Sequence, residues 1–247
     1  MQIEMIGDVL MPGIGTLINT AAIIAGGLFG TLAGSRFNEK LQKALNMACG
    51  VSVLFIGISG AMEGMLDAGS GGITSGRSMF VSLVLVIGTF TGELLDIEDK
   101  FERFGEWLKV KTGNAKDAQF VNAFVTASLT VCIGAMAIVG AIEDGIMGDY
   151  SILATKSVLD FVIVAVMTCS MGKGCGFSAI PVFILEGSIT VLAGLISPFM
   201  TEQALANLSL IGSILIFCVG MNIVWGKMVR VANMLPALII AVAAAFI

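Results

Sequence analysis

Histidine is absent from this chain of 247 residues, and charged residues make up only 13% of it. The absence of histidine removes the usual ligands of haem and zinc and the commonest general base. The phosphate-cradling loop of nucleotide-binding proteins, the nucleophile elbow of serine hydrolases and Cys–His pairs are missing as well. We therefore expect no cofactor, no metal site and no catalytic residue. The remaining enzymatic alternative is an intramembrane enzyme that works with Glu, Asp, Ser or Lys alone.

Hydrophobic residues take the place of charge, with 57% of the chain hydrophobic and a mean hydropathy of +0.98. A soluble domain this apolar would have too little polar surface to face water. Apolar stretches of about twenty residues, enough to cross a bilayer as a helix, lie near 13–34, 46–66, 78–96, 120–142, 152–171, 177–196, 205–225 and 231–247. The sequence predicts an all-α integral membrane protein with about eight transmembrane helices in one polytopic domain, residues 1–247.

Lysine and arginine are concentrated in alternate gaps between these stretches. Eleven of the thirteen lie after the first, third, fifth and seventh stretches: Arg36, Lys40, Lys43, Lys100, Arg103, Lys109, Lys111, Lys116, Lys173, Lys227 and Arg230. The positive-inside rule places these gaps in the cytoplasm and both termini outside. The N-terminal segment MQIEMIGDVLMPG lacks a basic region and a cleavage pattern, so we expect no removable signal peptide.

The longest polar stretch, at about 94–116, keeps its apolar residues at helical spacing. It predicts an amphipathic connection on the cytoplasmic surface, with Trp107 at the level of the lipid headgroups. A solvated connecting helix is the alternative. The segment 36–46, RFNEKLQKALN, is interpreted as a shorter element of the same kind.

Two carboxylates interrupt the apolar stretches. Glu186 stands near the middle of FSAIPVFILEGSITVLAGLISPFM, where a charged group costs roughly 3 kcal/mol on insertion scales. Asp160 follows Lys156 by four residues, so both side chains lie on one helix face. We interpret these three residues as candidate groups for binding an ion or a proton. For Lys156 and Asp160, an ion pair at the outer end of the fifth stretch is the alternative.

Neutral polar residues form a stripe in the fourth stretch, where Asn122, Thr126 and Thr130 recur every four residues. If the stripe lines a cavity, it offers ligands for a polar solute or a hard cation; hydroxyls bonded to their own helix would be inert. Further candidates in other stretches are Asn19, Asn222 and Ser178. Ser178 follows a glycine-rich break, MGKGCGFSAIP, which is either an anion-binding helix start or a tight turn.

Glycines at four-residue spacing, Gly26–Gly30–Gly34 and Gly88–Gly92, predict close helix packing within one chain or between two copies. Three stretches, beginning at Gly26, Gly88 and Glu186, also resemble one another. On the expected topology the third is inverted, so the first and second spans would repeat as the sixth and seventh. An inverted repeat is typical of secondary transporters. The alternative is a chance similarity between Gly- and Leu-rich segments.

Several long motifs resemble one known family: GTLINTAAIIAGGLFGTLAG, VNAFVTASLTVCIGAMAIVGAIEDGIMGD, KSVLDF, FSAIPVFILEGSITVLAGLISP and RVANMLPAL. Over essentially the whole chain they are similar to the bacterial membrane family called domain of unknown function 554, also described as YdfK/YqgA-like. The resemblance implies a multi-pass protein of the bacterial cytoplasmic (inner) membrane, and it carries over no catalytic residue. In that family Gln often stands at the position of Glu186, which implies a polar side chain there and not an obligatory acid.

These observations favour a secondary transporter or channel-like permease for a small solute or ion. Glu186 and Asp160 would respond to an ion or a proton, and the neutral side chains would bind the solute. The alternative from another class is a non-transporting membrane scaffold or accessory protein, packed as a homodimer through its glycine stripes. The expected partners are the lipid bilayer and the small solute, without nucleic acid.

Overall fold

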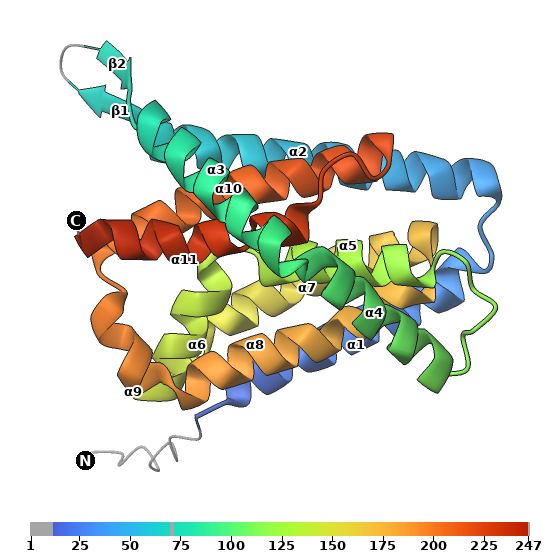
Figure 1. Ribbon diagram of the computed structural model, residues 1–247. Coiled ribbons are helices and arrows are strands. Elements are labelled where there is room, and N and C mark those ends of the chain that lie inside the picture. Colours follow the sequence, from blue (N-terminus) through green and yellow to red (C-terminus); the bar gives the residue numbers. More distant parts are fainter. Residues whose placement is uncertain (1–11, 70–71, 247) are drawn as a thin grey trace, which may run out of the picture.

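The computed structural model describes residues 12–69 and 72–246, and these form a bundle of helices with one small hairpin (Figure 1). The α-helices are α1 (Ile14–Gly34), α2 (Glu39–Met65), α3 (Ser78–Leu95), α4 (Ile97–Lys111), α5 (Phe120–Cys132), α6 (Ala135–Met147), α7 (Ser151–Met171), α8 (Ala179–Val191), α9 (Ala193–Ile196), α10 (Glu202–Trp225) and α11 (Pro236–Ala243). Short 3-10 helices are η1 (Lys173–Ser178), η2 (Ser197–Phe199), η3 (Val231–Met234) and η4 (Ala244–Phe246). The antiparallel strands β1 (Leu66–Gly69) and β2 (Gly72–Ser75) form the hairpin, which the sequence analysis did not predict.

Within the described residues, six helices are long and apolar enough to cross a membrane: α1, α2, α3, α7, the continuous segment of η1 and α8, and α10. The pair α5 and α6 makes a seventh if it counts as one span, and the last apolar segment, Val231–Phe246, is shorter. The prediction of a helical membrane protein is therefore confirmed, whereas the prediction of eight spans is not. The prediction that there is no removable signal peptide concerns residues 1–13. Residues 1–11 lie outside the described part, as does Ile247.

Two boundaries differ from the expectation. The stretch predicted at 120–142 is not straight, because α5 and α6 meet at an angle of 63°. Segment 36–46 is not a separate amphipathic element, because α2 already begins at Glu39 and continues to Met65. Asn38 caps this helix by accepting a hydrogen bond from the backbone N–H of Leu41 at 2.8 Å. The polar connection at 94–116 does contain a helix, α4, whose aromatic residue Phe101 stacks on Phe124 of α5.

Both glycine stripes lie where two helices of the chain come close together. A Cβ at Gly26 would lie 2.6 Å from the carbonyl oxygen of Phe161, and one at Gly34 would lie 2.9 Å from the Cα of Cys169. Both distances are too short for a side chain, so only glycine lets α1 lie this close to α7. On α3, Gly88 meets Ala237 of α11 in the same way. The close packing predicted from both stripes therefore occurs within one chain.

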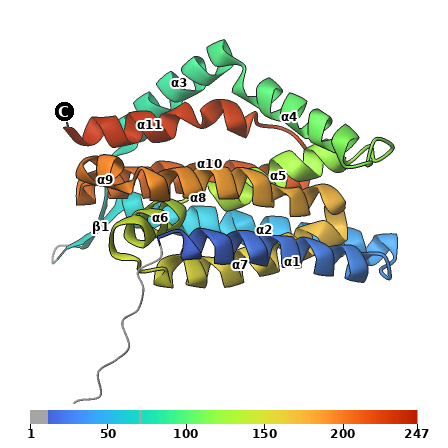
Figure 2. The ribbon, with the colours of Figure 1, turned by 90° about the horizontal axis from the view of Figure 1, so that it is seen from below.

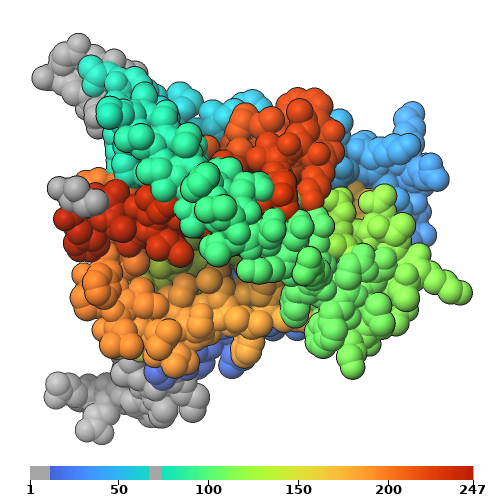
Figure 3. Space-filling view, viewed as in Figure 1, coloured from blue at the N-terminus to red at the C-terminus, as the bar shows by residue number. Residues whose placement is uncertain are grey.

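The bundle has two distinct ends and one covered face. α1 begins and η4 ends at the same end of the molecule, and the four connections rich in lysine and arginine lie towards the other end (Figure 1). α3 and α4 meet in a corner over one side of the bundle (Figure 2). In the space-filling view they run across the face turned to the reader (Figure 3).

α5 is the most enclosed helix of the bundle. Every residue from Ala123 to Val131 is buried, and α4, α7, α8, η1 and α10 all contact this helix. Backbone that is not helical is tolerated at membrane depth only inside protein or beside a water-filled cavity. Val131 and Ile133, at the end of α5, are buried, and several buried polar residues lie around this end.

Candidate functional site

The candidate site is built around the break between α5 and α6. α5 ends at Cys132, Ile133 is extended, and Gly134 has a φ of 151°, which L side chains rarely adopt. A broken helix leaves carbonyl groups of its last turn without helical partners. The carbonyl oxygen of Val131 accepts a hydrogen bond from Nζ of Lys156 at 2.8 Å. The break therefore presents a backbone acceptor to a buried ammonium group.

A cluster of charged and amide side chains surrounds this ammonium group. Lys156 forms an ion pair with Asp160 on the same helix, α7, and lies 3.6 Å from Oε1 of Glu186 on α8. Asn19 on α1 donates a hydrogen bond to the same Glu186 oxygen at 2.8 Å. Asn19 and Glu186 are fully buried, and Asp160 and Lys156 are 4% and 7% exposed. Four of the predicted site residues, from three separate helices, thus form one polar centre.

The charges of this polar centre do not balance. Two carboxylates and one ammonium group carry a net charge of −1 when all are ionised, and an unbalanced buried charge is expensive. Within the described residues, Oε2 of Glu186 and Oδ1 of Asn19 are buried acceptors without a hydrogen-bond partner. A proton or a small cation bound there would remove the excess charge and give these acceptors a partner.

Polar contacts continue from this centre along α1 and α8. Thr16 and Thr190 lie one helical turn further on, with their hydroxyl oxygens 3.3 Å apart. Beyond them, the backbone N–H of Gly15 donates to Oδ2 of Asp144 at 3.0 Å. Asp144 is fully buried, and its Oδ1 has no partner within the described residues. These residues were not among the sequence-predicted candidates.

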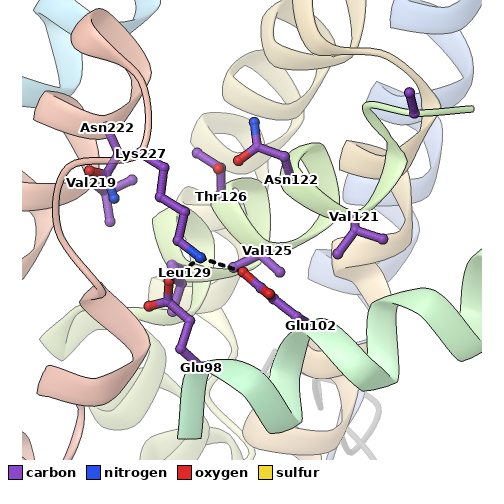
Figure 4. A pocket seen from close by; sticks show the side chains of 11 residues that line it. Glu98, Glu102, Val121, Asn122, Val125, Thr126, Leu129, Val219, Asn222 and Lys227 are labelled. Carbon is purple, nitrogen blue, oxygen red and sulfur yellow. Dashed lines mark hydrogen bonds and ion pairs between the residues drawn. The ribbon is translucent and has the colours of Figure 1, made fainter. Parts of the chain in front are cut away.

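A polar cavity of about 250 Å³ lies on the other side of the break, where α4, α5 and α10 meet (Figure 4). Asn122 and Thr126 of α5 line one wall. Lys227, from the connection after α10, reaches across the opening to Glu98 at 2.7 Å and also pairs with Glu102. Figure 4 shows the ammonium group of Lys227 between the two carboxylates. Uncharged polar side chains therefore line the inside of the cavity, and ion-paired side chains close its edge.

Other predicted residues have their polar groups occupied or lie apart from the polar centre. The Thr130 hydroxyl donates back to the Thr126 carbonyl at 2.8 Å, as in the inert alternative. Asn222 lines the cavity, but its amide holds the following connection through Met228 and Val229. Ser178 is fully buried without a hydroxyl partner in the described part, and it lies eight residues before Glu186, about 12 Å of helix.

The glycine-rich segment before Ser178 is a close-packed turn. A Cβ on Gly27 of α1 would lie 2.5 Å from the Cα of Gly176, and η1 also packs on α5. Its glycines serve these backbone contacts, so the tight-turn alternative describes the segment.

Glu98, Glu102, Lys227 and Asp144 were not predicted as site residues from the sequence. Glu98 and Glu102 stand four residues apart in the polar connection, which is a usable signal for a shared helix face. Because that connection was interpreted as a surface element, its carboxylates were not assigned to a site. Glu98 is in fact only 2% exposed.

Comparison with known proteins identifies relatives but no activity. The family model described as protein of unknown function (DUF554) matches residues 14–246. The chain is 29% identical over 235 residues to the uncharacterized protein YqgA of Escherichia coli (strain K12), covering 92% of this chain and 94% of that protein. It is 26% identical over 226 residues to the uncharacterized membrane protein YdfK of Bacillus subtilis (strain 168), covering 92% and 93%. No solved structure matches the chain.

Proposed function

The chain belongs to the DUF554 family of membrane proteins of unknown function, and we propose that it is a secondary transporter or channel-like permease for a small polar solute or ion. One observation carries this proposal. The buried centre formed by Asn19, Lys156, Asp160 and Glu186 lies at a break in the most enclosed helix. Discontinuous helices that present ionisable groups near the bilayer midplane are typical of transporter binding sites.

The polar cavity supplies an approach to this centre from the basic end of the bundle. Thr126 lines the cavity, and Val131, whose carbonyl group binds Lys156, lies five residues further along α5. Five residues of helix correspond to about 7.5 Å. Opening the ion pairs of Lys227 with Glu98 and Glu102 would admit a solute from one side. From the other side, an ion or a proton would reach the centre along the hydrogen-bonded side chains between α1 and α8.

The same proposal covers the finer topology. We infer that the bent pair α5–α6 and the segment Val231–Phe246 each complete a span, which brings the number to eight. Both termini would then be outside and the basic connections in the cytoplasm of a bacterial cell. An inverted repeat is supported by helix contacts, because α1 packs on α8 and α2 packs on α10, its expected counterparts. The scaffold alternative is weakened, since both glycine stripes are occupied by helices of the same chain.

The decisive experiment is uptake into proteoliposomes with a panel of ions and small metabolites. We expect Asp160→Asn to lower uptake roughly tenfold, equivalent to about 1.4 kcal/mol, because it removes the carboxylate paired with Lys156. Glu186→Gln keeps a polar partner for Asn19 but cannot titrate, so we expect it to flatten the pH dependence of uptake. Val158→Ala, on the exposed face of α7, is the matched control. Uptake unchanged in both site variants contradicts the assignment of the site.

A further inference from the structure

A second, apolar recess lies on the side of the molecule and adjoins the polar cavity at Leu129, which lines both. It is a groove of about 700 Å³ between α4, α8 and α11, and the break between α5 and α6 forms its floor. Phe101, Phe104, Leu185 and Leu238 are among its wall residues. Figure 3 shows this face, with α11 and α8 on either side of the groove. Such walls suit hydrocarbon and exclude a small polar solute.

The groove follows the direction of the bundle. On α8 it extends from Pro181 to Ser188, seven residues or about 10 Å of helix. A phospholipid acyl chain runs in the same direction when the helices cross a bilayer. The groove therefore has the orientation and the chemistry that an acyl chain requires.

Two polar groups in the wall indicate that the ligand has a polar headgroup in addition to a hydrocarbon chain. Lys100 on α4 lines the groove and is exposed, and it forms no ion pair within the described residues. The hydroxyl group of Ser128 is fully buried without a hydrogen-bond partner in the described part of the chain. A lipid phosphate complements the ammonium group, and an ester carbonyl complements the hydroxyl group.

We propose that this groove binds one acyl chain of an anionic phospholipid, whose phosphate lies at Lys100. The chain would fill the space beside Cys132 and Gly134, where the wall atoms otherwise lack contacts. The groove shares Leu129 with the cavity lined by Asn122, but none of its wall residues belongs to the Lys156 centre, so lipid binding is proposed independently of transport. The occupant is a lipid of the surrounding bilayer, since the groove opens on the apolar side of the bundle.

The test uses the whole protein in nanodiscs of phosphatidylglycerol and phosphatidylcholine. A phosphatidylglycerol probe with a diazirine in its acyl chain should label peptides of α8, α11 and the end of α5, mapped by mass spectrometry. Leu238→Trp fills the groove and should lower this labelling about tenfold. Val158→Trp, at a position 64% exposed on α7 and outside the groove, should leave it unchanged. Lys100→Gln should remove the preference for phosphatidylglycerol over a phosphatidylcholine probe.

Labelling of the wild-type protein that spreads evenly over its lipid-facing helices would overturn the proposal, and this readout needs no variant. Equal loss of labelling in Leu238→Trp and Val158→Trp would overturn it as well. So would an unchanged headgroup preference in Lys100→Gln, or retention of another apolar molecule in the groove. Size-exclusion chromatography of each variant confirms that the folded protein is being compared.

Discussion

Lys156 is the residue on which the polar centre depends. Its ammonium group contacts a carboxylate on its own helix, a carboxylate on α8 and a backbone carbonyl group at the end of α5. Three helices therefore meet at one nitrogen atom. The neighbouring thiol of Cys132 and the amide of Asn19 add no charge that could replace it.

Replacing this cation should be costly. Lys156→Met leaves Asp160 and Glu186 buried without a counter-ion, and breaking a buried pair by removing one partner costs about 3–5 kcal/mol. We expect a clearly lower midpoint of thermal unfolding in detergent. A second change, Asp160→Asn, should restore part of the loss, because it removes one of the two orphaned charges. Lys173→Met, at an exposed position, is the control; an equal loss in both single variants would contradict this account.

Lys227, at the edge of the polar cavity, makes a contribution to folding stability that depends on pH. Partial burial lowers its pKa, but hydrogen bonds and charge interactions with Glu102 and Glu98 raise the pKa more, so the net direction is upward. A raised pKa stabilises the folded state below the unfolded value of about 10.4, and the stabilisation is lost as the pH rises through the folded pKa.

We therefore expect the unfolding free energies of the wild type and Lys227→Met to differ by a constant amount between about pH 6 and pH 9. Since the ammonium group is partly solvated, this difference should be only about 0.2–1 kcal/mol. It should shrink above about pH 10.4. Denaturant titrations at several pH values measure it, and a difference that grows with rising pH would be the wrong sign.

Single residues also show how far sequence reasoning can reach. Glu186, Asp160 and Lys156 could be named because an ionisable residue inside an apolar stretch is rare. Asp144 could not, because it stands in EDGIMGD, which has the composition of a connection. Only the fold places its carboxylate against the start of α1. Asn222 was named as a ligand, yet the fold uses its amide to hold the next connection.

Among the elements, the break between α5 and α6 was the hardest to predict. The sequence from Val121 to Ile142 contains no charged residue and no proline, so it has the composition of one straight span. A single glycine inside a helical pattern is a weak signal. Gly134 breaks the helix because neighbouring helices enclose α5 and because Lys156 provides the donor that the freed carbonyl group of Val131 needs.

A substitution at Gly134 isolates this backbone effect. A Cβ there would meet no atom within 4 Å, so Gly134→Ala introduces no clash, only a φ of 151° that alanine adopts with strain. We expect a cost of about 1–3 kcal/mol in thermal unfolding, together with lower uptake. Gly194→Ala is the matched control, because a Cβ there also meets nothing within 4 Å and its φ lies outside the left-handed region. Equal stability of the two variants would contradict a structural role of the break.

At the scale of the whole molecule, the order of the helices and the grouping of the basic connections at one end (Figure 1) agree with the pattern in the sequence. Most helices coincide with the predicted apolar stretches within a few residues, because stretches long enough to span leave little choice of boundary. The hairpin β1–β2 was not predicted, since its eight paired residues carry no alternating pattern strong enough to suggest strands. The pairing of α1 with α7 was also beyond the sequence, because glycine spacing marks a close contact without naming the partner.

Cysteine labelling in whole cells tests the proposed sidedness. Single cysteines at Ser75 and Asp149, which are exposed at the end of the bundle poor in basic residues, should react with an impermeant maleimide from outside. Cysteines at Lys40 and Lys111, exposed at the other end, should react only after permeabilisation. A background in which the five native cysteines are replaced by alanine serves as the control. The reverse pattern would show that the topology is inverted, and labelling of both ends from the same side would contradict eight spans.

The long contacts of α1 with α7 and of α2 with α10 have a consequence for biosynthesis. α2 ends at Met65 and α10 ends at Trp225, so 160 residues (225 − 65) are translated between them. At about 5–20 residues per second, synthesis of α10 is complete roughly 8–32 s after synthesis of α2. During this interval its surface, including Gly57 and Gly64, faces lipid or an insertion factor. A ribosome that stalls before α10 would therefore release a chain whose first helices are inserted but unmatched, a ready substrate for membrane quality control.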